Sequence, residues 1–209
     1  MKLCIISDTH NKHKRLKLPE ADAIIHCGDF TSEGKEHQVR DFLKWYSKLE
    51  QYKHRLIIAG NHDWLFERAG MLARSLVPKN IHYLQDNGVE LDGVYFYGTP
   101  VQKPFYNWAF NRPEEKLAQH WAAIPDHTDV LITHDLPYSI MDLSVYDGTH
   151  CGSPSLYKEV LERIKPKIHC FGHVHSGYGI KIIENTTFIN ASNLDEDYMC
   201  VNDPIVIDI

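Results

Sequence analysis

Five short blocks of the chain carry residue types that bind metal ions. Each follows an apolar stretch and supplies aspartate, histidine or asparagine. Asp8 and His10 are two positions apart, as are His173 and His175, a spacing that points side chains the same way in an extended segment. The blocks are Asp8-Thr9-His10, Gly28-Asp29, Gly60-Asn61-His62-Asp63, Thr133-His134-Asp135 and Gly172-His173-Val174-His175.

These side chains offer carboxylate, imidazole and amide oxygen, without thiolate. Such a mixture favours Mn, Fe or Zn as bound ions over a structural zinc site made of cysteines. One carboxylate can bridge two ions, and two ions about 3.5–4 Å apart can clamp the attacking and leaving oxygens of a phosphoryl group. The blocks therefore predict a metal site for phosphoester chemistry.

Strands and helices alternate through most of the sequence, and the five blocks follow predicted strands. Loops beyond the carboxyl ends of strands form the ligand crevice of open α/β sheets, so distant blocks can converge there. Helical spacing of apolar residues predicts helices over residues 36–49, 113–122 and 153–164. Strands are predicted over residues 2–7, 23–26, 55–59, 81–84, 89–91, 94–97, 130–133, 168–171, 180–183, 187–189 and 205–207. This order predicts one α/β domain over residues 1–209.

The order of the five blocks resembles that of the calcineurin-like metallophosphoesterase family. Further segments resemble its brain-type metallophosphoesterase-domain branch and the microbial relatives of that branch. They are Gly98-Thr99-Pro100, Trp108-Ala109-Phe110-Asn111, Gly177-Tyr178-Gly179, Asn190-Ala191-Ser192 and Pro204-Ile205-Val206-Ile207-Asp208. The resemblance implies a four-layer αββα sandwich of two mixed sheets flanked by helices. One departure is Asp135, because that branch usually has glycine after the histidine of this block.

The resemblance also implies two sets of metal ligands that share one bridging carboxylate. A hydroxide between the ions is the implied nucleophile, because divalent ions lower the pKa of water. His62 is the implied general acid, oriented by Asp63 or Asp135. The expected ions are two Mn²⁺, with Fe or Zn as alternatives. The ligand sets are Asp8, His10, Asp29 and His175 for one ion, and Asp29, Asn61, His134 and His173 for the other.

Two long loops, residues 99–112 and 139–152, are rich in aromatic residues, Pro, Asn and Asp, so both are expected to flank a site. One hypothesis for the first loop is that Trp108 stacks on a nucleobase while Asn107 and Asn111 contact phosphate or sugar. The alternative is a hydrophobic cluster beneath a long loop.

Composition narrows the choice of partners and compartment. The net charge is −6 and no basic block stands out, which disfavours stable binding to a nucleic-acid backbone. The five cysteines form no CxxC pair and suggest a reducing compartment. No signal peptide or membrane-spanning run is expected, so we predict a cytoplasmic protein. The sequence carries no prediction of oligomeric state.

The predicted function is that of a metal-dependent phosphodiesterase, a hydrolase acting on cyclic nucleotides or other small phosphodiesters. A phosphomonoesterase or protein phosphatase is an alternative, because the same two-metal core serves both. A non-catalytic interaction module with the same fold is disfavoured, because none of the seven expected ligands is missing.

Overall fold

A computed structural model describes residues 1–209 and contains two β-sheets. The first sheet has the order β11-β1-β2-β3-β4, and only β11 runs antiparallel to its neighbour. Its central strands pair in a regular parallel register, with Ile5 opposite Ile25 and Ile25 opposite Leu56. Its strands are β1 (Lys2–Ile6), β2 (Ala23–His26), β3 (His54–Ile57), β4 (His82–Tyr83) and β11 (Ile205–Asp208).

The second sheet has the order β5-β6-β7-β8-β10-β9. Its four inner strands are parallel, and the two edge strands β5 and β9 are antiparallel to their neighbours. A hairpin turn at Asp92-Gly93 joins β5 to β6, and both turn residues have positive φ, as expected from the sequence. Its strands are β5 (Asn87–Leu91), β6 (Val94–Thr99), β7 (Val130–Thr133), β8 (Ile168–Phe171), β9 (Gly179–Ile183) and β10 (Thr186–Asn190).

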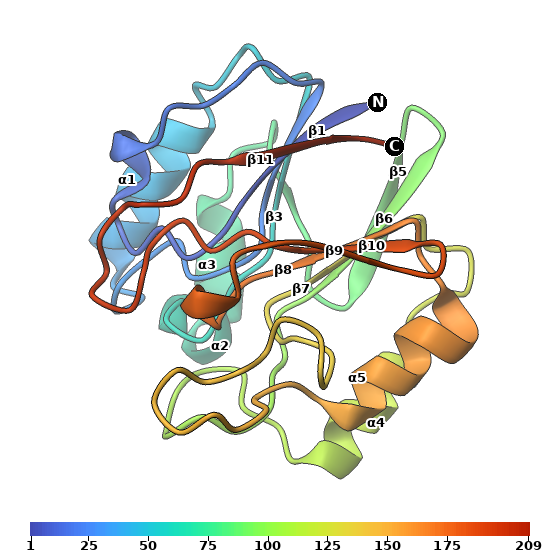
Figure 1. The fold of residues 1–209 in the computed structure, drawn as a ribbon. Coiled ribbons are helices and arrows are strands. Elements are labelled where there is room, and N and C mark those ends of the chain that lie inside the picture. The colour runs from blue at the N-terminus through green and yellow to red at the C-terminus, as the bar shows by residue number, and fades with distance from the viewer.

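The sheets face each other across an apolar core, and helices cover their outer faces (Figure 1). Ile5 and Leu56 of the first sheet pack in this core with Phe96 and Ile132 of the second. Helices α1 (Glu36–Tyr46), α2 (Trp64–Arg68) and α3 (Gly70–Leu76) lie beside the first sheet. Helices α4 (Glu114–Ala122) and α5 (Pro154–Lys158) lie beside the second. The predicted four-layer sandwich of two mixed sheets is confirmed.

Helix α1 ends at Tyr46 and not at residue 49, and α4 begins one residue later than predicted. Two larger departures concern whole segments. The helix expected over residues 153–164 begins as α5, with Ser153 accepting a hydrogen bond from the Leu156 N–H, but continues as a π-helix over Glu159–Ile164. Helices α2 and α3 were not predicted, because five and seven residues are too few to establish a helical repeat. No helix has the length and apolar character that a bilayer crossing requires.

Candidate metal centre

The five blocks meet where strands of both sheets end. Asp8, Asp29 and Asn61 follow β1, β2 and β3 of the first sheet, whereas His134 and His173 follow β7 and β8 of the second. The backbone N–H of His173 donates to both carboxylate oxygens of Asp8, at 3.2 and 3.1 Å. This contact joins the two sheets across the site.

The backbone reaches this arrangement by turning, not by staying extended. Asp8, His10, Asp29 and His173 all have left-handed φ values, of 51°, 39°, 56° and 68°. Non-glycine residues seldom adopt this conformation, and such strain gathers at functional sites. The expectation that the two-residue spacings act through extended strands is therefore wrong, although the side chains do converge.

The carboxylate of Asp29 lies at the centre of the cluster. Its Oδ2 is 3.4 Å from His134 Nε2, 3.8 Å from His10 Nε2 and 3.9 Å from His62 Nε2. Its Oδ1 accepts a hydrogen bond from the backbone N–H of His62 at 2.7 Å. One oxygen is thus held by the protein while the other faces three imidazole rings.

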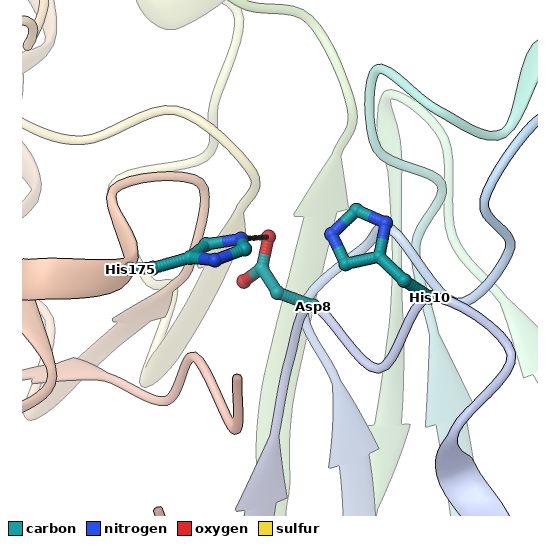
Figure 2. Close-up of side chains that lie close together, drawn as sticks. All are labelled: Asp8, His10 and His175. Atoms are coloured by element: carbon teal, nitrogen blue, oxygen red, sulfur yellow. Dashed lines mark ion pairs between the residues drawn. The ribbon is translucent and has the colours of Figure 1, made fainter. Parts of the chain in front are cut away.

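A second part of the cluster contains Asp8, His10 and His175, whose ligand atoms lie within 4.8 Å of one another. Figure 2 shows the two rings on either side of the Asp8 carboxylate, whose Oδ1 is 3.6 Å from His175 Nε2. Ser192 donates to Asp8 Oδ2 at 2.8 Å, which fixes the carboxylate. The ligand atoms of Asp8, Asp29 and His134 also lie within 4.8 Å of one another, so the Asp8 and Asp29 parts of the cluster overlap.

Backbone carbonyls orient three of the histidines in the same way. The Nδ1 atoms of His62, His134 and His175 lie 2.7, 2.9 and 2.8 Å from the carbonyl oxygens of Ser32, Cys27 and Asp195. A carbonyl oxygen only accepts, so each Nδ1 carries the hydrogen. In the neutral rings of the predicted ligands His134 and His175, Nε2 then carries the lone pair that can coordinate a cation, as is usual for metal-binding histidines.

The electrostatics of the cluster favour a bound cation. Burial lowers the pKa of His134, but the Asp29 and Asp8 carboxylates outweigh it and raise the value to about 10. His175 behaves alike: burial opposes the effect of Asp8, and its pKa rises to about 9. Burial tends to raise the pKa of Asp8, yet His175 and His134 hold it well below the usual range. A field that draws protons onto these rings also attracts metal ions.

His10 gives the strongest sign that a ligand is expected. Both ring nitrogens are buried, and neither has a hydrogen-bond partner. Burial lowers the pKa of His10 to about 4, so the ring is neutral near pH 7. Unpaired buried polar atoms are costly. A divalent cation coordinated by His10 beside Asp8 and Asp29 would remove that cost, so this donor set fits such an ion.

Other predicted ligands complete the cluster. Asn61 Oδ1 is 2.8 Å from His134 Nε2, and the His134 and His173 rings are 5.1 Å apart. His173 lines one pocket together with His10, Asp29, Asn61 and His175. The structure therefore brings all seven predicted ligand residues together.

Asp63 does not orient His62, contrary to one expectation. Its carboxylate accepts hydrogen bonds from the backbone N–H groups of Asp29, Gly60 and Thr31, at 2.8–2.9 Å. Burial, followed by the charge of Asp29, raises the pKa of Asp63 to about 7. Asp63 instead holds together the loops that follow β2 and β3.

Asp135 does not reach His62 either. Its two oxygens accept from the backbone N–H groups of Lys103 and Leu136, at 2.8 and 2.9 Å. Lys103 lies in the loop of residues 99–112, so the carboxylate fastens this loop to the end of β7. These contacts give Asp135 a structural role in positioning the loop.

Trp108 and Asn111, two of the predicted substrate residues, contact neighbouring groups of the protein. Trp108 stacks on the His62 ring, with centroids 4.0 Å apart and an interplanar angle of 25°. The Asn111 amide is occupied within its own loop by Gln102, Phe105 and Tyr106. Neither residue lines the pocket above the cluster, and nor does Asn107. The expected contact of Asn107, Trp108 and Asn111 with substrate therefore stays a prediction, without support from the pocket lining.

Three loops supply the pocket wall instead. Phe105 comes from the loop of residues 99–112, and Val145 and Tyr146 come from the loop of residues 139–152. Glu196 and Tyr198 come from the segment between β10 and β11, and the sequence did not predict that either residue lines a site. That segment's only distinguishing feature in the sequence is a run of three acidic residues, Asp195, Glu196 and Asp197, followed by Tyr198.

The fold and this cluster of carboxylates and histidines define a class of metal-dependent phosphoesterases. The family model described as calcineurin-like phosphoesterase matches residues 1–177, and the chain belongs to this family. It is therefore a metal-dependent hydrolase of phosphoesters. The predicted resemblance to this family is confirmed.

Related proteins support this assignment. The chain is 36% identical to human metallophosphoesterase domain-containing protein 1 over 227 residues, covering 98% of this chain and 69% of the human protein. It is also 36% identical to UPF0046 protein K07C11.7 of Caenorhabditis elegans over 223 residues, covering 99% and 74% of the two chains. Among solved structures, TT1561 of Thermus thermophilus superimposes with a TM-score of 0.64 at 15% identity, covering 90% of this chain and 88% of that one. That likeness supports the fold alone.

Proposed function

We propose that this protein is a phosphodiesterase of small phosphodiesters, a class that includes cyclic nucleotides. The observation that carries the proposal is that no lysine or arginine lines the pocket over the metal cluster, whereas Phe105, Val145 and Tyr146 do. Phosphomonoesters approach two negative charges at neutral pH, and proteins commonly bind such groups with arginine or lysine. A diester carries one charge and a second organic substituent, which suits an apolar wall.

We assign two divalent cations to the seven ligands. Asp8, His10 and His175 would hold one, Asn61, His134 and His173 the other, and Asp29 would belong to both sets. When bound, such ions neutralise phosphate charge and lower the pKa of a water that can attack phosphorus. The ligand chemistry suits Mn²⁺, with Fe or Zn as alternatives.

His62 is proposed to protonate the leaving alcohol. Its ring lines the pocket, its Nδ1 is held by the Ser32 carbonyl, and its Nε2 faces the cluster. Trp108 supports the ring from one side. The proton would move from His62 Nε2 to the leaving oxygen as the P–O bond breaks. In this proposal Asp63 positions the loop that carries His62 and takes no part in proton transfer.

The cysteines support a proposed location in the cytoplasm. All five are free, and Cys4, Cys27 and Cys170 are buried. Free thiols are typical of reducing compartments, in which disulfides are rare.

The deciding experiment is a substrate panel with Mn²⁺-loaded protein. It compares a bis-aryl phosphodiester, an aryl phosphomonoester, and 3′,5′- and 2′,3′-cyclic nucleotides. We expect kcat/KM for the diesters to exceed that for the monoester. A monoester preference would favour a phosphomonoesterase or protein phosphatase instead. Metal analysis of the same sample should give about two ions per chain, and one ion would contradict the dinuclear assignment.

A further inference from the structure

Glu196 is an acidic side chain in the pocket proposed above to bind a phosphodiester. It lines the pocket beside His175 and Tyr198, and its Oε1 is buried without a hydrogen-bond partner. It belongs to none of the groups of three whose ligand atoms lie within 4.8 Å of one another. Its carboxylate therefore has no assigned role in holding a metal ion.

The loop that carries Glu196 is fixed in place. The Asp195 N–H donates to the Met199 carbonyl at 3.0 Å, and the Tyr198 N–H donates to the Asp195 carbonyl at 2.9 Å. Asp195 Oδ1 accepts from the N–H groups of Asp197 and Met199. The Asp195 carbonyl also accepts from His175 Nδ1 at 2.8 Å, which joins this loop to a predicted metal ligand. Glu196 is thus presented at a defined position.

Aromatic rings from three loops surround the same space. Phe105, Tyr146 and Tyr198 all line the pocket, and their side chains are 44%, 83% and 41% exposed. Tyr198 packs with its ring nearly perpendicular to those of His10 and His175, at interplanar angles of 78° and 80°. Rings beside a carboxylate are the usual surroundings for an organic cation, because the carboxylate supplies charge and the ring faces attract it.

We propose that Glu196 is a specificity-determining residue, which selects phosphodiesters whose alcohol carries a positive charge, as amino-alcohol esters do. Phe105, Tyr146 and Tyr198 would enclose the cationic group while the phosphodiester lies over the metal ligands. The inference rests on the proposed phosphodiesterase function and narrows its substrates to zwitterions. A wholly anionic diester would leave the Glu196 charge unpaired, which costs free energy in a partly buried site.

The test compares two p-nitrophenyl phosphodiesters of nearly identical shape. One carries a choline group, and the other carries 3,3-dimethylbutyl, in which carbon replaces the quaternary nitrogen. With Mn²⁺-loaded wild-type protein we expect kcat/KM to be about tenfold higher for the choline ester, within the range of a desolvated cation–aromatic contact. A third ester bearing 2-acetamidoethyl, which has an N–H donor but no hydroxyl that could attack phosphorus, tests whether a neutral hydrogen-bond donor suffices. If kcat/KM for this third ester equals or exceeds that for the choline ester, the proposal is overturned.

Two variants separate local charge from overall charge. Glu196→Gln keeps the shape and an acceptor oxygen but removes the charge, so the choline preference should fall to near one. Asp197→Asn removes the same charge one residue away, from an exposed side chain outside the pocket, and should keep the preference. Loss of the preference in both variants would assign the effect to general electrostatics and overturn the proposal.

Binding gives a readout that does not need turnover. Calorimetry should show tighter binding of phosphocholine than of 3,3-dimethylbutyl phosphate to the metal-loaded protein, and Glu196→Gln should abolish the difference. If neither diester is hydrolysed but this difference in binding persists, the proposed phosphodiesterase function fails and the role of Glu196 stands. If both diesters are hydrolysed and bound equally, the role of Glu196 fails and the phosphodiesterase function stands.

Discussion

At the scale of single residues, His62 is held by contacts independent of substrate. The Ser32 carbonyl fixes Nδ1 and Trp108 stacks on the ring, so the imidazole needs little reorganisation to donate a proton. We expect His62→Asn to keep its metal content by elemental analysis. Its kcat should fall by about 10²–10⁴-fold on an alkyl ester, the usual contribution of general acid catalysis. It should fall less on a p-nitrophenyl ester, whose leaving group needs little protonation. Near wild-type turnover of the alkyl ester would exclude the acid role.

Trp108 should act through His62 and not through a nucleobase. Stacked aromatic pairs contribute about 0.5–1.5 kcal/mol, so Trp108→Ala should lower kcat about two- to tenfold. The fall should be similar for a cyclic nucleotide and for an aryl diester, with KM little changed, and Trp108→Phe should restore most of it. A rise in KM confined to nucleotides would instead support the original hypothesis of a base-stacking wall.

At the scale of elements, the ends of the strands must approach closely for the site to form. A Cβ on Gly172, which follows β8, would overlap Asp8 Oδ2 and Ser7 Oγ. We expect Gly172→Ala to weaken metal affinity about tenfold or more, as disturbed support of ligands commonly does. Titration of the chelator-treated variant and wild-type proteins with Mn²⁺ measures the two affinities.

Gly70→Ala is the matched control for that substitution. No atom lies within 4 Å of a Cβ at Gly70, which begins α3. The Gly70→Ala substitution should leave metal affinity unchanged. It should raise the free energy of unfolding by up to about 1 kcal/mol, because alanine favours helices. Equal metal affinity in both glycine variants would contradict the close-approach argument.

The arrangement of elements explains which parts of the site could be predicted from the sequence. The residue types and order of the five blocks predicted the seven residues that the structure brings together, because metal chemistry restricts the residue types and strand ends place them at one edge. The roles of Asp63 and Asp135 could not be read in this way. Both carboxylates bind backbone N–H groups of distant loops, and such contacts leave no spacing pattern in the sequence.

At the scale of the whole molecule, buried neutral histidines should make stability depend on pH. His169 in β8 is buried, and this burial lowers its pKa to about 3. In the unfolded chain a histidine titrates near pH 6.5, so below that pH the unfolded state binds a proton that the folded state excludes. The free energy of unfolding therefore has its full value above about pH 6.5. It decreases as the pH falls toward 3, by up to about 1.4 kcal/mol per pH unit.

His169→Gln isolates this contribution. The Thr133 hydroxyl that contacts His169 Nε2 can still bind glutamine, and glutamine does not titrate. Urea denaturation of metal-free protein at pH 7, 6 and 5 should show a shallower decline in unfolding free energy for the variant. Parallel declines for both proteins would mean that His169 does not carry the effect.

The sequence by itself determined which residues gather in the candidate metal centre, the alternation of strands and helices, and the family. These depend on local periodicity and on the chemistry of metal binding, both of which can be read from residue types and spacing. Only the tertiary structure decided which side chains wall the pocket. Trp108 packs on His62 while Glu196 and Tyr198 face the site, because loops distant in sequence fix one another through contacts that no local pattern encodes.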